Sequence, residues 1–230
     1  MQVQNLSKRF GARWVLEEVA FHVEQGEVLG LIGPNGSGKT TLFECLAGLT
    51  PADQITVVFR NQSLPTSKRK TALFYMPDGI APWADQSVSW ALSFFERLYK
   101  SSARAVEIMR VLHLDALGQA RIGSLSKGER KRTLLALALL TPQPLVMLDE
   151  PFDGLDLRQT RDVMALLRQH TTGGRTLMLS IHQLADAARV CDRLVLLSAG
   201  HVVGEGTIDE LRAQTKLSEG GLEEIFLALT

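Results

Sequence analysis

The stretch Gly33-Pro-Asn-Gly-Ser-Gly-Lys-Thr40 decides the fold of this chain. It follows the apolar run Val28–Ile32 and leads into a helical pattern, Thr40–Leu49. The stretch matches the pattern G-x-x-x-x-G-K-[S/T], in which backbone N–H groups and a helix N-terminus surround phosphate oxygens. We therefore predict a phosphate-binding loop between a strand and a helix. The alternative is a glycine-rich turn that only caps a helix.

Two side chains of this loop have specific expected roles. Lys39 is expected to reach the β- and γ-phosphates of a nucleotide, and the Thr40 hydroxyl is expected to bind Mg²⁺. The candidate nucleotide-binding residues of the loop are Gly33, Pro34, Asn35, Gly36, Ser37, Gly38, Lys39, Thr40 and Thr41.

Apolar runs alternate with helical patterns along most of the chain. The further runs are Ala72–Met76, Leu145–Leu148, Thr176–Ile181 and Leu194–Leu197. Helical segments between them predict an α/β fold with a parallel sheet covered on both faces, because parallel strands need long crossovers. The range 81–132 instead shows helical spacing and no convincing strand. We expect a single domain, 1–230, with a core (1–80 and 133–230) and a helical insertion (81–132).

Two carboxylates follow the apolar run that ends at Leu148. Asp149 and Glu150 are expected at the carboxyl end of a parallel strand, where ligands of open α/β sheets bind. Asp149 is suited to hold Mg²⁺ through a water molecule, and Glu150 is suited to act as the general base that polarises an attacking water. The alternative is a strand that simply ends in acidic residues at the surface.

Composition excludes a bulk polyelectrolyte partner. The chain has 230 residues, with 25 Lys+Arg against 25 Asp+Glu, so we expect no nucleic-acid partner. The charges are segregated, since the range 100–132 holds eight basic and three acidic residues while 144–162 holds five acidic and two basic. Two distant cysteines indicate a reducing compartment, with the cytoplasm as the default. We expect neither a membrane-spanning helix, which needs ~20 apolar residues, nor a signal peptide, because the N-terminus shows no charged segment followed by an apolar one.

A further set of motifs carries a family resemblance. Leu125-Ser-Lys-Gly-Glu129 precedes the expected helix Lys131–Leu140, and Leu148-Asp-Glu-Pro151, Gly154-Leu-Asp156 and the isolated His182 follow in that order. Together with the phosphate loop, this order resembles the nucleotide-binding subunit of an ATP-binding cassette (ABC) transporter over essentially the whole chain. The resemblance implies a P-loop NTPase fold, with a RecA-like parallel core and an N-terminal antiparallel β part. It also implies ATP hydrolysis with ATP and Mg²⁺ as cofactors.

The resemblance assigns roles to residues outside the phosphate loop. Phe10 matches an aromatic residue that stacks on adenine, although Trp14 lies close by and an aromatic residue can simply pack the N-terminal hairpin. Ser126 and Gly128 match residues that contact the γ-phosphate of ATP held by the opposite subunit. The working unit is therefore expected to be a head-to-tail dimer around two ATP molecules. Asp156 matches the aspartate of a loop that crosses that interface.

His182 matches the switch histidine, which contacts the γ-phosphate and helps to hold the attacking water. The resemblance thus makes Glu150 and His182 the catalytic residues, and Thr40, Asp78 and Asp149 the metal-binding ones. Asp78 departs from the family, which has a neutral glutamine there, and Pro77-Asp-Gly79 can also be a simple turn. The segment Leu125-Ser-Lys-Gly-Glu129 matches the signature sequence of the family, and we call it the signature. Its Lys127 and Glu129 stand where the family usually has glycine and glutamine.

The implied partners are a second copy of this chain, or a paired ABC subunit, and an integral membrane permease. The chain is then expected at the cytoplasmic face of the cell membrane, as part of an exporter. Part of a docking surface could come from Trp83, Trp90, Phe94 and Phe95, but we expect at least half of them to be core. The alternatives are an ABC ATPase that acts on ribosomes or nucleic acid and a regulator that binds ATP without turnover.

Overall fold

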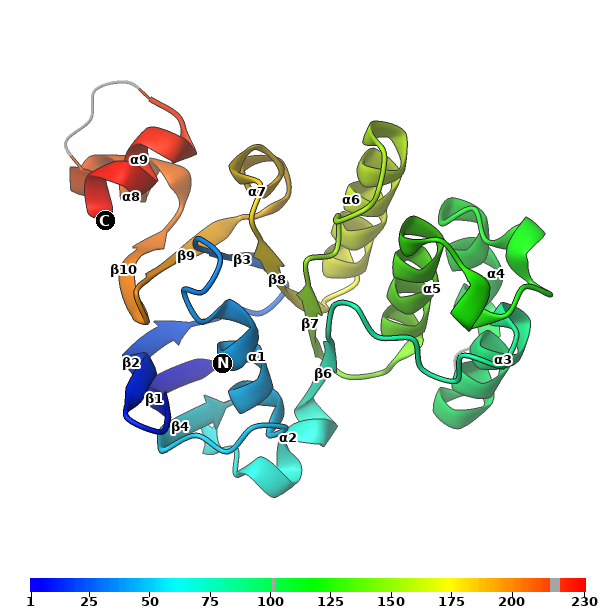
Figure 1. Cartoon of the computed structure of the whole chain (residues 1–230), viewed down its shortest axis with the longest axis horizontal. Helices are drawn as coiled ribbons and strands as arrows, with labels where there is room; N and C mark the ends of the chain where they lie inside the picture. The colour runs from blue at the N-terminus through cyan, green and yellow to red at the C-terminus, as the bar shows by residue number, and fades with distance from the viewer. Residues whose placement is uncertain (101, 216–219) are drawn as a thin grey trace.

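The strands of the computed structural model, which describes residues 1–100, 102–215 and 220–230, form two sheets (Figure 1). An antiparallel sheet has the order β2-β1-β4-β5, and a second sheet has the order β10-β9-β3-β8-β7-β6. In the second sheet only β10 runs antiparallel to its neighbour, so the predicted parallel core and antiparallel β part are both confirmed. The strands are β1 (Gln2–Phe10), β2 (Arg13–His22), β3 (Val28–Ile32), β4 (Gln54–Phe59), β5 (Gln62–Ser63), β6 (Leu73–Met76), β7 (Leu145–Asp149), β8 (Thr176–Ile181), β9 (Arg193–Ser198) and β10 (His201–Gly206).

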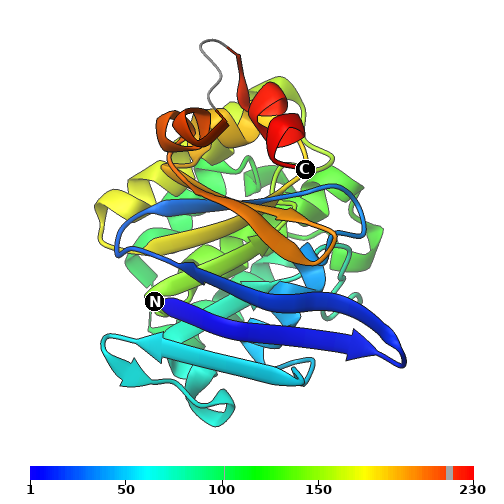
Figure 2. The same cartoon turned by 90° about the vertical axis from the view of Figure 1, so that its left-hand side faces the viewer.

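The helices cover the parallel sheet on both faces. The α-helices are α1 (Lys39–Ala47), α2 (Thr66–Ala72), α3 (Val88–Tyr99), α4 (Ser102–Val111), α5 (Lys127–Leu140), α6 (Leu157–Thr172), α7 (Leu184–Val190), α8 (Ile208–Thr215) and α9 (Leu222–Leu229). Figure 2 looks onto the antiparallel sheet, behind which α1 lies against the parallel one. The helices α3, α4 and α5 gather at the opposite end of the molecule (Figure 1).

Alternation along the buried strands places side chains in two separate cores. Every residue of β3 is buried, yet Val28 and Ile32 pack with α5, α6 and α7, whereas Leu29 and Leu31 pack with α1 and the antiparallel sheet. Successive strand residues point to opposite faces, so an uninterrupted apolar run serves two cores at once. The sheet is thereby fixed between its two helical layers, with its carboxyl edge free to hold a site.

The helix boundaries differ from the predicted ones for local reasons. The first helix ends at Ala47, because Gly48 adopts a left-handed conformation with φ 78°. The signature helix α5 begins at Lys127, before the expected Lys131, because the Ser126 side chain caps it and Glu129 completes a capping box. The predicted boundary between insertion and core at 132/133 therefore falls inside one continuous helix.

The aromatic residues of the insertion are mostly at the surface. Trp83, Trp90 and Phe94 are 43%, 41% and 40% exposed, and only Phe95 is buried. The expectation that at least half of the four are core is wrong. The three exposed rings instead pack on one another, with Trp90 stacked on Phe94 at a centroid distance of 5.4 Å and Trp83 edge-on to both. We call Trp83, Trp90 and Phe94 the aromatic surface.

No helix within the described ranges is long and apolar enough to cross a membrane.

Candidate functional site

The phosphate loop joins β3 to α1 and has little room for side chains. A Cβ on Gly33 would lie 2.2 Å from the carbonyl oxygen of Leu197, and one on Gly38 would lie 2.6 Å from Leu16 Cδ2. Gly38 also has φ 108°, a conformation that glycine adopts at little cost. These positions leave the backbone N–H groups at the start of α1 unobstructed, as a phosphate cradle requires.

Lys39 lies within this loop and is only 6% exposed. Its Nζ donates to the carbonyl oxygens of Gly33, at 2.7 Å, and Pro34, at 3.2 Å. Burial lowers the pKa of Lys39, while the charges of Glu150 and Asp149 oppose that shift. Its ammonium group is thus held at the loop by neutral carbonyls.

Asp149 ends β7 and is 2% exposed. Its Oδ2 accepts hydrogen bonds from the hydroxyls of Thr40, at 3.0 Å, and Tyr75, at 3.2 Å, and its Oδ1 accepts from the Ser180 hydroxyl. Two predicted metal-binding residues, Thr40 and Asp149, are therefore in direct contact. Burial raises the pKa of Tyr75 and the Asp149 charge adds to the shift, so the phenol stays a neutral donor.

Ser180 and Tyr75 were not predicted from the sequence. Ser180 is the one hydroxyl in the interior of the apolar run of β8, and it lies beside Asp149 in the strand register. A buried polar residue needs a partner, so a serine in such a run is the signal that could have found it. Tyr75 carries a weaker signal, since a tyrosine near the end of a strand is common.

The two predicted catalytic residues face each other. Glu150 Oε2 pairs with His182 Nδ1, with the glutamate side chain 19% and the histidine 43% exposed. Glu150 has φ 49°, and its N–H donates to the backbone oxygen of Ser180, at 3.2 Å, and to its Oγ, at 3.1 Å. A non-glycine residue in the left-handed region is held there by its surroundings. Here β8 holds Glu150 beside a small cleft that includes Asp153 and His182.

The signature turn packs against the loop after Pro151. Lys127 Nζ bonds Asp153 Oδ2 at 2.6 Å, and a Cβ on Gly128 would lie 2.6 Å from the carbonyl oxygen of Gly154. The carboxylate of Asp156 caps α6 by accepting from the Gln159 N–H at 2.8 Å. The contacts of Ser126, Gly128 and Asp156 with a second copy stay predictions.

The two candidate adenine-stacking residues lie at the surface. Phe10 is 53% and Trp14 46% exposed, at the turn that joins β1 and β2. Lys8 Nζ lies 4.7 Å from the Phe10 ring centroid, and the Arg9 guanidinium lies 5.5 Å from that of Trp14. Neither ring is part of the core, and the choice between them as the adenine-stacking residue stays open.

The third predicted metal-binding residue has a different partner. Asp78, in the loop after β6, forms an ion pair with Lys131 of α5. Its role as a magnesium ligand stays a prediction.

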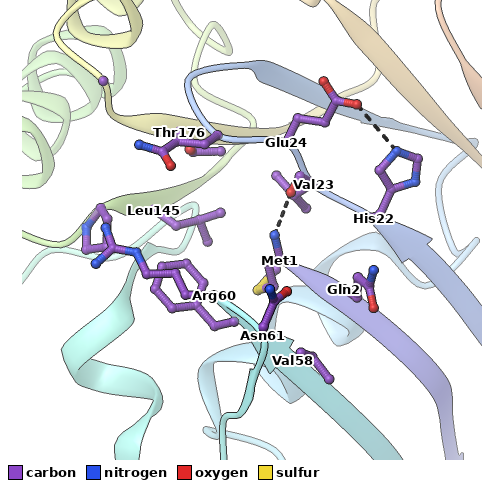
Figure 3. Close-up of a pocket in the computed structure, with 14 residues that line it drawn as sticks. Met1, Gln2, His22, Val23, Glu24, Val58, Arg60, Asn61, Leu145 and Thr176 are labelled. Carbon is purple, nitrogen blue, oxygen red and sulfur yellow. Dashed lines mark hydrogen bonds and ion pairs between the residues drawn. The ribbon is translucent and has the colours of Figure 1, made fainter.

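Another cavity lies at the opposite edge of the sheet (Figure 3). It is lined by Leu145 and Thr176, the first residues of β7 and β8, and by Met1, whose amino group donates to the Val23 carbonyl at 2.5 Å. None of the predicted site residues lines it. Ligands of such sheets bind at the carboxyl edge, so this cavity is separate from the candidate site.

The loop after β3 and the acidic end of β7 meet at one edge of a parallel sheet, and this geometry places the chain in the P-loop class of nucleoside triphosphatases. Three further features narrow the choice of family within that class. They are the helix cap at Ser126, the pair of Glu150 with His182, and the inserted helices.

Comparison with known proteins identifies the family. The ABC transporter family matches residues 16–153. The Nod factor export ATP-binding protein I of Burkholderia lata is 32% identical over 88% of this chain and 69% of its own length. The lipopolysaccharide export system ATP-binding protein LptB of Escherichia coli K12 is 30% identical over 92% of both chains. A solved structure of the ATP-binding subunit of an ABC transporter superposes with a TM-score of 0.89 at 30% identity, covering 99% of this chain and 98% of that one.

The chain belongs to the ABC transporter family, as an ATP-binding subunit that hydrolyses ATP.

Proposed function

We propose that this chain is the ATPase subunit of an export system. Two ATPase subunits close on ATP and Mg²⁺ and drive a separate integral membrane subunit, from a position at the cytoplasmic face of the membrane. The observation that carries the proposal is the contact between Thr40 and Asp149 beside the pair of Glu150 and His182. The relatives that are named for Nod factor export and lipopolysaccharide export support export as the direction of transport.

The residues present fit a magnesium nucleotide. The Thr40 hydroxyl and the Asp149 carboxylate are hard oxygen donors, and Mg²⁺ is usually held by one or two carboxylates together with substrate phosphates. When bound, the ion would neutralise charge on the phosphate oxygens. Lys39 and the N-terminus of α1 bind the phosphates, while Asp149 is kept in place by Tyr75 and Ser180.

The catalytic step depends on a water aligned with the terminal phosphate. Glu150 accepts a proton from that water, and His182 holds the glutamate in one orientation through Nδ1. The backbone of Glu150 is anchored to Ser180, so the carboxylate has little freedom to swing away. Replacing Glu150 by Gln removes the base while keeping the shape of the side chain, and hydrolysis is expected to fall by about 10²–10⁴.

The second copy is proposed to supply the signature. Ser126 is exposed at the N-terminus of α5, a helix end that favours phosphate. The Glu150→Gln variant with ATP and Mg²⁺ should therefore form a stable dimer by light scattering. In that background Ser126→Asp keeps the helix cap but places a negative charge against phosphate, so it should give monomers, whereas Ser126→Thr should still dimerise. A monomer for Glu150→Gln itself would overturn the sandwich arrangement.

The membrane subunit is proposed to dock on the aromatic surface. Its rings are about two-fifths exposed, and they lie on α3 and on the loop that leads from Asp78 to that helix. A tagged copy of the chain, purified from detergent-solubilised membranes, should bring an integral membrane protein with it. Trp90→Ser with Phe94→Ser should lose that protein, and Leu49→Ser, at a residue that is 68% exposed, should keep it. Recovery with ribosomes alone would instead favour the non-transport alternative.

A further inference from the structure

Lys131 is a charged residue in an unusual position. It lies in the second turn of α5, its side chain is 3% exposed, and every residue from Lys131 to Leu140 is buried. Its Nζ donates to Asp78 Oδ1 and, at 3.3 Å, to the backbone oxygen of Asp149. One amino group therefore joins the signature helix, the end of β7 and the loop after β6.

A buried ammonium group needs a counterion. Taking such a charge out of water is costly unless it is paired and hydrogen-bonded, and the long contact with the Asp149 carbonyl alone does not supply a charge. Among the described residues, Lys131 forms its ion pair with Asp78. The carboxylate of Asp78 is 36% exposed, so it reaches the lysine from the solvent side of the contact.

We propose that Asp78 is a positioning residue whose carboxylate serves as the counterion of Lys131 and ties the loop after β6 to α5, in place of a role as a Mg²⁺ ligand. We call this ion pair the Asp78–Lys131 tether. The charges of the pair cancel, so the two residues together add no net charge to this part of the site. A carboxylate already paired with an ammonium group has less negative charge to offer a cation.

The tether also links the two proposed working surfaces. The loop that it holds runs from Asp78 to Trp83 of the aromatic surface, and the helix that it holds begins at the signature residue Ser126. A displacement of the loop at the aromatic surface must either move α5 or break the Asp78–Lys131 tether. This consequence rests on the proposed function, whereas the tether itself does not.

A second ion pair on the same helix provides a matched control. Lys127, one turn before Lys131, pairs with Asp153, but its side chain is 60% and that of Asp153 33% exposed. Exposed pairs contribute little, because water already solvates both charges. Asp153→Asn is therefore expected to change the melting temperature of the nucleotide-free protein by less than about 2 °C.

The first test measures thermal unfolding of the full chain without nucleotide or Mg²⁺. Asp78→Asn should lower the melting temperature by about 4–8 °C, because it leaves Lys131 buried without its counterion. Adding Lys131→Met removes the stranded charge, so the double variant should recover to within about 2 °C of the wild type. A chain that fails to fold as Asp78→Asn but folds as the double variant gives the same support. An unchanged single variant, or a double variant no more stable than the single one, would overturn the tether.

The second test asks whether Asp78 binds Mg²⁺. In the Glu150→Gln background, ATP should raise the melting temperature as free Mg²⁺ increases. We compare the Mg²⁺ concentration that gives half of this rise in Glu150→Gln alone and in Glu150→Gln combined with Asp78→Asn and Lys131→Met. The two concentrations should agree within about threefold, because the added substitutions remove no Mg²⁺ ligand. An increase of about tenfold or more, at an unchanged melting temperature without nucleotide, would identify Asp78 as a ligand. Failure of ATP to raise the melting temperature of the background protein would count against the proposed function, and leave the first test to decide the tether.

Discussion

Two lysines, Lys39 and Lys131, are buried at the same edge of the parallel sheet, yet their partners differ. Lys39 is held by two carbonyl oxygens of its own loop, whereas Lys131 is paired with the carboxylate of Asp78. A buried charge that is hydrogen-bonded only to neutral groups can still attract an anion strongly, while a charge paired directly with a counterion has little attraction left. Burial alone therefore does not mark a lysine that binds a ligand, since the partner decides whether the charge attracts a ligand or stabilises the fold.

The largest expected effect separates the two lysines by nucleotide affinity. Lys39→Met should weaken ATP binding at least about 100-fold, because the phosphates lose a charge-assisted hydrogen bond in a site shielded from water. Its melting temperature without nucleotide should stay within about 2 °C of the wild type, since no ion pair is broken. Isothermal titration calorimetry and thermal unfolding measure the two quantities.

Lys131→Met is the matched control for this comparison. Its ATP affinity should stay within about threefold of the wild type. Equal losses of affinity in Lys39→Met and Lys131→Met would show that the two lysines do not differ in the way that their partners indicate.

A smaller effect is expected at Ser180, which is fully buried and donates to Asp149. Ser180→Ala leaves Asp149 Oδ1 without this donor and removes one acceptor of the Glu150 N–H. A buried polar group without a partner costs about 1–3 kcal/mol, which corresponds to a fall of about 2–12 °C in melting temperature. Differential scanning calorimetry checks this value, and Ser124→Ala, at an exposed hydroxyl, should change it by less than about 2 °C.

The smallest effect is expected at Tyr75. Tyr75→Phe removes the longer of the two hydroxyl contacts to Asp149 Oδ2 and leaves Thr40 in place. We expect ATP hydrolysis to fall by only about threefold, because the Thr40 and Ser180 hydroxyls still donate to the Asp149 carboxylate. A loss of more than about 100-fold in steady-state phosphate release would mean that Tyr75 takes part in the chemistry directly.

The parts of the site that are contiguous in sequence could be predicted. The phosphate loop needs glycines at close approaches and a strand before it, and both are visible in Gly33 and the run Val28–Ile32. The acidic end of β7 is equally local, since Asp149 and Glu150 directly follow the run that ends at Leu148.

The rest depended on distances across the fold. Lys131 lies in a charged stretch of sequence that resembles a solvated helix face, and its burial follows from the docking of α5 against β6 and β7. Its partner Asp78 is 53 positions away in the sequence. The prediction that the aromatic residues of the insertion are mostly core is wrong for a related reason, since a helical period shows that Trp90 and Phe94 share a face but not what that face contacts.

The aromatic surface also gives the chain a spectroscopic signal. The chain has three tryptophans, of which Trp83 and Trp90 lie with ring centroids 5.9 Å apart, while Trp14 lies in β2 near its first residue. The Trp14→Phe variant would therefore fluoresce from the insertion alone. Its emission would shift to shorter wavelengths when a membrane subunit covers the two remaining indoles, and docking could then be followed in real time without any added label.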